Sequence, residues 1–291
     1  MKKIGWIGLG HMGIPMATNL INAGVPLFVY NRTEEKAKTL VDKGAVYCSS
    51  PKEVAEQADI IFTMLTDSSS VEQVFSGEEG VFHASTEGKL IVDMSTISPE
   101  DSRRFAALAI KKGASFLDAP VSGSIKPAQE GKLVILVGGN SRDVEICRSY
   151  FNILGKTFIH FGDHGSGSFA KLVINSLLAI TVQGTSEVLL LAEKGGLDRE
   201  QVLHMIGESA VGTPLIQGKK ELFLKEEFVP AFMLKLMTKD LGLALDAARQ
   251  SRISLPLTET AKVHYSKAND NGKGDMDLTA IFLELQESNR T

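Results

Sequence analysis

Short apolar runs alternate with amphipathic stretches through residues 1–161 of the chain. Runs typical of buried strands occupy Ile4–Ile7, Leu27–Tyr30, Ile60–Leu65, Leu90–Asp93, Ser115–Leu117, Leu133–Val137 and Thr157–Phe161. Stretches with helical periodicity lie between them, at Met12–Asn22, Glu34–Lys43, Pro51–Gln57, Ser68–Phe75, Pro99–Lys112 and Ser141–Ile153. This alternation predicts a mostly parallel β-sheet covered by helices. The interval between Leu117 and Leu133 leaves little room for a crossover helix, so the later part of the sheet need not be parallel.

The rhythm changes after Phe161, where no further run resembles a strand. Residues 166–194 form one apolar-rich helical stretch that Gly195-Gly196 ends. Because it is apolar on most faces, we expect other helices or a second subunit to bury it. Further helices are predicted at Asp198–Ser209, Pro214–Leu224, Leu234–Gln250 and Pro256–Ala268, and from Asp277 after a loop at 269–274. We therefore predict an α/β N-terminal domain (1–162) and an all-α C-terminal domain (163–291), joined by a long inter-domain helix at about 166–194.

The composition excludes several classes of partner. The net charge is −4 and no long basic run occurs, so we expect no nucleic acid. Cys48 and Cys147 lack metal-ligand spacing, so we expect no metal and two buried thiols in a reducing compartment. The uncharged segment Leu172–Ser186 is 15 residues long, fewer than the roughly 18 that span a bilayer. The N-terminus does not read as a signal peptide, so we expect a cytoplasmic protein that inserts in no membrane.

A glycine motif, GLGHMG at residues 8–13, follows the first predicted strand and precedes a helix. That context is the one in which such glycines cradle a dinucleotide pyrophosphate, because the helix N-terminus offers free amides to the anion. The first glycine permits a tight turn, the second a close approach of the phosphate, and the third close packing of the helix. We expect the cofactor to contact Gly8, Leu9, Gly10, His11, Met12 and Gly13.

The end of the second predicted strand distinguishes NAD from NADP. An acid there would bind the ribose hydroxyls of NAD, but the chain has Asn31-Arg32-Thr33. Arg32 can pair with a 2′-phosphate and stack on adenine, and Thr33 can donate a hydrogen bond to the phosphate. We therefore predict NADP(H), with Arg32 as a solvated surface charge as the other interpretation. We also expect Met64 and Leu65, at the end of a later strand, to contact the cofactor.

Lys171 and Asn175 lie four residues apart, so they share one face of the long helix. An unpaired ammonium is costly in apolar surroundings, so Lys171 either reaches solvent or faces a polar site. In a site, it could stabilise the alkoxide that forms when hydride reaches a carbonyl carbon, and then protonate it. A lysine is ordinarily protonated at pH 7, which suits reduction. Oxidation would need the neutral amine.

Three further segments are candidates for ligand binding. Ser122, with the amides of Gly123 and Ser124, could form an anion nest, although an ordinary turn would have the same sequence. Residues 93–96, Asp-Met-Ser-Thr, end a strand at the edge where ligands bind in such sheets. Late in the chain, Phe232 could supply an apolar wall. Lys239-Asp240 could supply a charge pair, unless it is a surface pair.

In this order and spacing, the segments GLGHMG, DAPVSGS, GSGSFAKLVIN and LMTKD resemble the β-hydroxyacid dehydrogenase family. That family includes 3-hydroxyisobutyrate dehydrogenase, tartronate semialdehyde reductase and the glyoxylate/succinic semialdehyde reductases. The resemblance extends over nearly the whole chain. It implies a Rossmann N-terminal domain, a long inter-domain helix and an all-α C-terminal domain that supports homodimers or homotetramers.

The resemblance also implies a role for each matching residue. Lys171 would be the catalytic acid/base, and Thr96 and Lys239 would approach the nicotinamide cofactor. The substrate would contact Ser122, Gly123, Ser124, Asn175, Phe232 and Asp240. Many members have two glycines after the serine, whereas this chain has Ser124 in the second position. Together with residues 31–33, this stretch looks most like the NADPH-dependent glyoxylate/succinic semialdehyde reductases.

These features favour NADPH-dependent reduction of a small aldehyde acid to its hydroxy acid. The nearest alternative is NAD(P)-dependent oxidation of 3-hydroxyisobutyrate or another β-hydroxy acid. Imine reductases resemble the same family but usually carry another residue at the lysine position, so Lys171 disfavours that activity. An alternative of a different class is a non-catalytic dinucleotide-binding scaffold, which Lys171 also disfavours.

Overall fold

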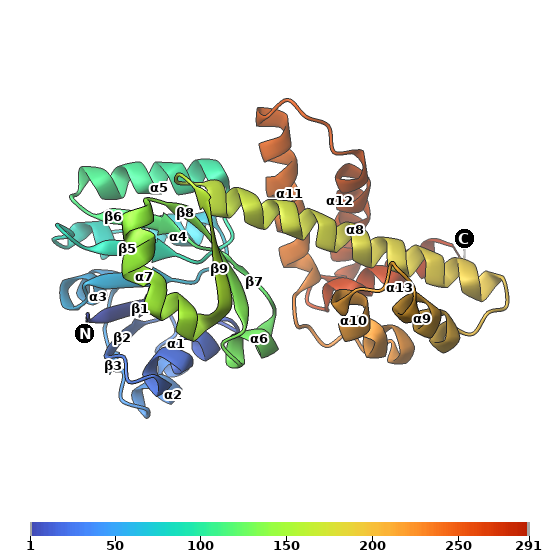
Figure 1. Cartoon of the computed structure of the whole chain (residues 1–291), viewed down its shortest axis with the longest axis horizontal. Coiled ribbons are helices and arrows are strands. Elements are labelled where there is room, and N and C mark those ends of the chain that lie inside the picture. The colour runs from blue at the N-terminus through green and yellow to red at the C-terminus, as the bar shows by residue number, and fades with distance from the viewer. Residues whose placement is uncertain (1, 290–291) are drawn as a thin grey trace. The chain divides into compact units, whose positions relative to one another are not determined.

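The computed structural model describes residues 2–289, which fall into two compact units divided between Lys171 and Leu172. In the described part of the first unit, a nine-stranded sheet has the order β3-β2-β1-β4-β5-β6-β8-β7, and β9 pairs with β8 (Figure 1). The strands are β1 (Ile4–Ile7), β2 (Leu27–Tyr30), β3 (Val46–Tyr47), β4 (Ile60–Thr63), β5 (Leu90–Asp93), β6 (Ser115–Asp118), β7 (Val121–Ser122), β8 (Leu133–Gly139) and β9 (Gly155–Gly162).

Strands β1 to β6 pair in parallel, whereas β8 runs antiparallel to both β6 and β7. The change of direction follows from chain length, because only β7 and the short α6 (Ile125–Gln129) separate β6 from β8. The possibility of a non-parallel section is thus confirmed. Strands β3 and β7 and helix α6 were not predicted, because each is too short to show a hydrophobic period.

Helices cover both faces of this sheet (Figure 1), and successive strand residues alternate between two hydrophobic cores. Trp6 and Phe62 belong to one core, whereas Ile7 and Ile61 belong to the other. Burial on both faces explains why these strands read as continuous apolar runs. The other helices of this unit are α1 (Gly13–Asn22), α2 (Lys38–Val41), α3 (Pro51–Gln57), α4 (Ser68–Ser76), α5 (Pro99–Lys111) and α7 (Ser141–Leu154). A 3-10 turn, η1 (Glu34–Ala37), replaces the first half of the helix expected at 34–43.

The long helix α8 (Ser166–Lys194) begins in the first unit and continues in the second. The helices that follow are α9 (Arg199–Glu208), α10 (Pro214–Lys225), α11 (Leu234–Gln250), α12 (Pro256–Ala268) and α13 (Ile281–Ser288). They confirm the prediction of an all-α second part. By its length and mean hydropathy of 1.4, α8 could cross a membrane. Interior helices of soluble proteins share these properties, so they do not by themselves identify α8 as a membrane span.

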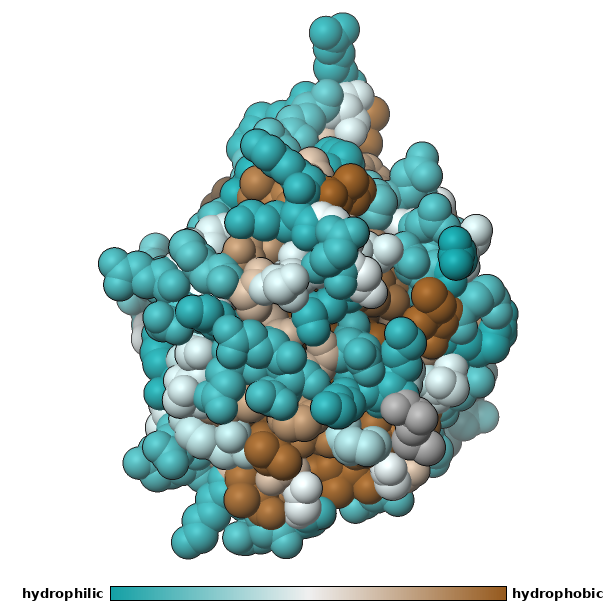
Figure 2. Space-filling model, turned by 90° about the vertical axis from the view of Figure 1, so that its left-hand side faces the viewer, coloured by the Kyte–Doolittle hydropathy of each residue, from teal (hydrophilic) through white to brown (hydrophobic). Residues whose placement is uncertain are grey.

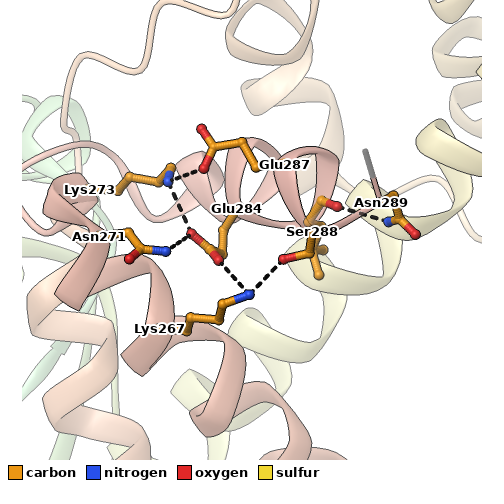
Figure 3. A network of polar contacts seen from close by, with 8 residues as sticks. Lys267, Asn271, Lys273, Glu284, Glu287, Ser288 and Asn289 are labelled. Carbon is orange, nitrogen blue, oxygen red and sulfur yellow. Dashed lines mark hydrogen bonds and ion pairs between the residues drawn. The ribbon is translucent and has the colours of Figure 1, made fainter. Parts of the chain in front are cut away.

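Residues 269–274 do not form the expected loop. Instead, Asn269–Lys273 make a kinked π-turn directly after α12, in which Asn271 (φ −83°, ψ 19°) and Gly272 (φ +81°) depart from helical geometry. The reason lies in a buried carboxylate on α13, Glu284, which accepts hydrogen bonds from Asn271 Nδ2 at 2.9 Å and Lys273 Nζ at 3.0 Å (Figure 3). The turn presents both donors toward this carboxylate.

The same carboxylate joins three successive segments of the second unit (Figure 3). Its other oxygen lies 3.2 Å from Lys267 Nζ on α12, and Lys273 also bonds Glu287 at 2.8 Å. Burial alone would raise the pKa of Glu284, but the hydrogen bonds from Asn271, Lys273 and Lys267 outweigh it and lower the pKa to about 2. Glu284 is therefore ionised at neutral pH and ties α12 and the π-turn to α13.

The surface seen in Figure 2 is mainly hydrophilic, with small separate apolar areas. Apolar side chains that lie more than two-fifths exposed in the first unit include Val41, Val46 and Ile110. Single exposed apolar residues of this kind are ordinary on a folded protein.

Candidate active site

The glycine motif lies where the order of the sheet reverses. Strand β1 has β2 on one side and β4 on the other, and the motif follows its carboxyl end, the position at which such sheets bind ligands. Gly8 has a φ of +101°, and an added Cβ would lie 2.3 Å from the Met64 carbonyl oxygen. At Gly13 a Cβ would lie 2.0 Å from the Gly8 carbonyl oxygen. Both positions therefore exclude any side chain.

Gly10 differs from these two glycines, because an added Cβ there would meet no protein atom within 4 Å. The space beside Gly10 is open, as a phosphate-binding loop requires. Helix α1 begins at Gly13 with no acidic residue in its first turn and no side-chain cap from Met12. Its positive end can therefore face an anion. This arrangement fits a dinucleotide pyrophosphate.

Asn31 braces the loop from the end of β2. Its Oδ1 accepts a hydrogen bond from Leu9 N at 2.9 Å, and its Nδ2 donates to the Thr33 carbonyl at 2.8 Å. Arg32 and Thr33 are exposed beside it, as is His11 in the loop. The side chain that replaces the acid of NAD-binding sequences thus also holds the loop in place, which its sequence position did not reveal.

The loops after β4 and β5 are joined at the same edge of the sheet. Leu65 N donates to Ser95 Oγ at 2.9 Å, and Met64 N donates to the Ile7 carbonyl at 2.9 Å. Thr96 follows directly and is half-buried. Met64, Leu65 and Thr96 are therefore held on adjacent loops beside the glycine motif.

Asp93 fixes this pair of loops from below. Its Oδ1 accepts hydrogen bonds from Thr63 Oγ1 at 2.8 Å and from Ser95 N at 3.1 Å. Burial raises the pKa of Asp93 and the charge of Asp118 adds to the effect, whereas the bonds from Ser95 and Thr63 oppose it. The sequence pointed to this segment, but not to the bond that links it to β4.

Lys171 lies in the second turn of α8 and is 9% exposed, so its ammonium does not extend freely into solvent. The start of this helix is bonded to Asp118 at the end of β6, whose two carboxylate oxygens accept from Gly165 N and Ser168 N. The local sequence pattern gives no sign of this role for Asp118, because its bonding partners follow 47 and 50 residues later. Asn175 follows Lys171 after four residues and is buried.

The segment Ser122-Gly123-Ser124 forms a sharp turn. Ser122 ends β7, Gly123 has a φ of +136°, and Ser124 is the N-cap residue before α6, whose side chain makes no capping hydrogen bond. A Cβ at Gly123 would lie 2.7 Å from the Leu133 side chain, so glycine is required there on two grounds.

In the second unit, Asn175 and Asp240 lie together. Asn175 Nδ2 on α8 donates to Asp240 Oδ2 on α11 at 2.6 Å, and both residues are 2% exposed. Lys239 Nζ lies 3.0 Å from the other oxygen of Asp240, so the pair is partly buried rather than a free surface pair. Phe232 precedes α11, where its backbone N–H donates to Asp277 at 3.2 Å.

Cys147 and Cys48 lie in the two hydrophobic cores of the first unit. Both Cys48 and Cys147 are buried and free, and burial raises the pKa of each thiol, to about 11 for Cys48. Among residues 2–289, His, Cys, Asp and Glu side chains form no group of three that could hold a metal ion.

Two family matches divide the chain between them. Residues 3–162 match the family described as the NAD binding domain of 6-phosphogluconate dehydrogenase. Residues 165–285 match the one described as NAD-binding of NADP-dependent 3-hydroxyisobutyrate dehydrogenase. The chain belongs to the β-hydroxyacid dehydrogenase family. Its members are NAD(P)-dependent oxidoreductases, so the cofactor of this β-hydroxyacid dehydrogenase homologue is a nicotinamide dinucleotide.

Individual relatives are similar to this chain over nearly their full lengths. The 2-(hydroxymethyl)glutarate dehydrogenase of Eubacterium barkeri is 38% identical, over 96% of this chain and 93% of the relative. Glyoxylate/succinic semialdehyde reductase 1 of Arabidopsis thaliana is 36% identical, over 98% and 99%. The 2-hydroxy-3-oxopropionate reductase of Escherichia coli is 38% identical, over 98% and 97%. The resemblance identified from the sequence is thus confirmed.

A solved structure confirms the fold class. The 3-hydroxyisobutyrate dehydrogenase of Mycobacterium tuberculosis, solved with L-serine, has a TM-score of 0.89 and 32% identity, over 98% of this chain and 99% of that one. The predicted combination of a Rossmann domain, a long helix and an all-α domain is therefore correct for this member of the family.

Proposed function

We propose that this β-hydroxyacid dehydrogenase homologue reduces a small aldehyde acid to the hydroxy acid with NADPH, and that Lys171 is the general acid. The observation that carries the proposal is a nearly buried lysine on α8, one helical turn before the buried amide of Asn175. Names of relatives support this substrate class, since two of those described above are reductases of glyoxylate, succinic semialdehyde or 2-hydroxy-3-oxopropionate.

The cofactor, when bound, supplies the hydride. The protein must stabilise negative charge on the carbonyl oxygen and then provide a proton, and an ammonium group does both. Lys171 is proposed to donate a hydrogen bond to that oxygen, transfer its proton to it and recover a proton from solvent. Ser122, Gly123 and Ser124 are proposed to bind the substrate carboxylate through hydroxyl and amide donors. Asn175, Phe232 and Asp240 keep their predicted roles in substrate binding, and Thr96 and Lys239 theirs beside the cofactor.

The preference for NADP(H) rests on the end of β2. Arg32 and Thr33 are exposed there, and Asn31 supplies no negative charge that would repel a 2′-phosphate. The family description of residues 165–285, which names an NADP-dependent dehydrogenase, supports the same choice. Comparison of kcat/KM for NADPH and NADH tests it, and a clear preference for NADH would refute it.

Oxidation of 3-hydroxyisobutyrate or a similar β-hydroxy acid is the second candidate. The structural likeness to the Mycobacterium tuberculosis 3-hydroxyisobutyrate dehydrogenase favours it. Assays in both directions separate the two candidates. Oxidation of NADPH is measured with glyoxylate, succinic semialdehyde and 2-hydroxy-3-oxopropionate, and reduction of NAD(P)+ is measured with 3-hydroxyisobutyrate. Tight cofactor binding without turnover of any of them would instead indicate a non-catalytic scaffold.

We also propose a homodimer or homotetramer in the cytoplasm or another reducing compartment. Exposed apolar side chains on α8 support the oligomer, since Val173, Leu177 and Leu191 are 60%, 59% and 73% exposed. Buried free thiols agree with a reducing compartment. Sedimentation of the purified protein tests the first proposal, since a monomer would contradict it.

A further inference from the structure

Asp118 holds the beginning of the helix that carries Lys171. The first amides of an α-helix have no partner within the helix, and a buried helix start needs donors satisfied from outside. Asp118 Oδ1 accepts from Gly165 N at 2.7 Å, and Oδ2 accepts from Ser168 N at 2.8 Å. Asp118 is 1% exposed, so these bonds are shielded from water. One oxygen thus binds the residue that precedes α8, and the other binds the first turn of α8.

The backbone of α8 rests directly on the sheet at this point. A Cβ added to Gly167 would lie 2.3 Å from the Leu136 carbonyl oxygen and 2.7 Å from the Asp118 carbonyl oxygen. A Cβ added to Gly138 on β8 would lie 2.7 Å from both carboxylate oxygens of Asp118 and 2.7 Å from Gly167 N. A side chain at Gly167 or Gly138 would therefore block the close contact between the backbone of α8 and the sheet. The helix start cannot slide along the sheet without losing its bonds to Asp118.

Asp118 has an acidic neighbour on the adjacent strand, and both of its own oxygens serve as acceptors. It lies beside Asp93 in the register of β5 and β6, so two acids occupy neighbouring positions at this edge of the sheet. An asparagine in place of Asp118 would offer one acceptor oxygen and one NH2 donor to the two backbone N–H groups. One of these N–H groups would therefore face another donor and lose its hydrogen bond.

We propose that Asp118 is a positioning residue for the reaction, which sets the location of Lys171 through the first turn of α8. Lys171 lies three residues beyond Ser168, whose backbone N–H binds the Asp118 carboxylate. Less than one helical turn therefore separates the bonded amide from the residue that carries the ammonium. The inference rests on the proposed role of Lys171 as the general acid. It extends that role to a residue whose two carboxylate oxygens both accept from backbone amides at the start of α8.

A double-mutant cycle tests the proposal, because a residue that acts through Lys171 has no further effect once the lysine is gone. Asp118→Asn is expected to lower kcat by about 10- to 100-fold, the effect of moving a catalytic group by about 1 Å. The KM for NADPH should stay within about twofold, since the glycine motif is untouched. In the Lys171→Ala background the same change should alter kcat by less than about twofold. If Asp118→Asn lowered kcat by the same factor with and without Lys171, the two residues would act independently and the proposal would be overturned.

A matched control separates positioning from general loss of stability. Asp198 caps α9 by accepting from Gln201 N at 2.9 Å, and asparagine is an equally good cap where one acceptor suffices. Asp198→Asn should therefore leave kcat unchanged. Should Asp118→Asn not fold, the cycle is repeated with Gly167→Ala, which displaces the helix start and retains the carboxylate. Wild-type kcat in a folded Gly167→Ala protein would contradict the proposal.

The cycle also distinguishes failure of the inference from failure of the proposed function. If Lys171→Ala itself retained full kcat, the general-acid role would be wrong. If Lys171→Ala lost activity and Asp118→Asn did not, only the positioning role would be wrong.

Discussion

Replacing Glu284 by glutamine tests the buried ion cluster at the C-terminal end of the chain (Figure 3). The pKa of Glu284 falls from 4.5 to about 2 on folding, since hydrogen bonds from Asn271, Lys273 and Lys267 outweigh its burial. At about 1.4 kcal/mol per pKa unit, ionised Glu284 contributes on the order of 3 kcal/mol to the free energy of unfolding at pH 7. Glutamine is isosteric but neutral, so most of this contribution should be lost.

The sign of the pH dependence follows from the direction of the shift. Because the folded pKa lies below the unfolded one, the stabilisation is complete above about pH 4.5 and is lost as the pH falls toward 2. The difference in unfolding free energy between wild type and Glu284→Gln should therefore shrink from about 3 kcal/mol at pH 7 to about 1 kcal/mol at pH 3. Urea unfolding followed by circular dichroism at both pH values measures it.

Glu287 provides the matched control. It also pairs with Lys273, at 2.8 Å, but its side chain is 55% exposed, whereas that of Glu284 is 2% exposed. Exposed ion pairs contribute at most about 1 kcal/mol, so Glu287→Gln should cost far less than Glu284→Gln. Equal losses in the two variants, or a loss in Glu284→Gln that does not change with pH, would refute the reasoning.

Three further predictions concern the candidate active site. Lys171→Ala should lower kcat by about 10²-fold or more while NADPH still binds, as measured by steady-state kinetics and fluorescence titration, and an unchanged kcat would remove Lys171 from the mechanism. Arg32→Ala should mainly raise the KM for NADPH and leave that for NADH unchanged; equal changes in both would show that Arg32 does not contact the 2′-phosphate. Gly13→Ala should lower the Tm of the cofactor-free protein, since its Cβ would lie 2.0 Å from a carbonyl oxygen, whereas Gly10→Ala should leave that Tm unchanged and weaken NADPH binding. A lower Tm for Gly10→Ala would contradict the open space assigned to that position.

Elements with a clear hydrophobic period were predictable from the sequence. Strands β1, β2 and β5 and helices α3, α11 and α12 have the predicted bounds, because turns or proline and glycine signals flank each of them. The two-residue strands β3 and β7 were not predictable, since their pairing depends on strands that are distant in the sequence. The π-turn at Asn269–Lys273 was missed for a similar reason, because Glu284 stabilises it from the next helix.

The candidate site divides along the same line. Residue types and spacing were enough to select the glycine motif and Lys171, since local backbone geometry determines their environment. The contacts that hold them in place were not predictable. Asp118 lies 47 residues before Gly165, its bonding partner, and Asn31 lies 22 residues after Leu9, so only the folded sheet reveals these bonds.

The two bonds of Asn31 have a consequence for how dinucleotide choice could change. An aspartate at position 31 would retain the oxygen that accepts from Leu9 N, and its second oxygen would replace the donor that now faces the Thr33 carbonyl oxygen. Exchanging a single nitrogen for oxygen would thus place a negative charge at the end of β2, where NAD-binding sequences carry an acid, while the bond to Leu9 N still supports the phosphate loop. A single atom of residue 31 could therefore change the choice between NAD and NADP without removing the hydrogen bond that supports the phosphate-binding loop.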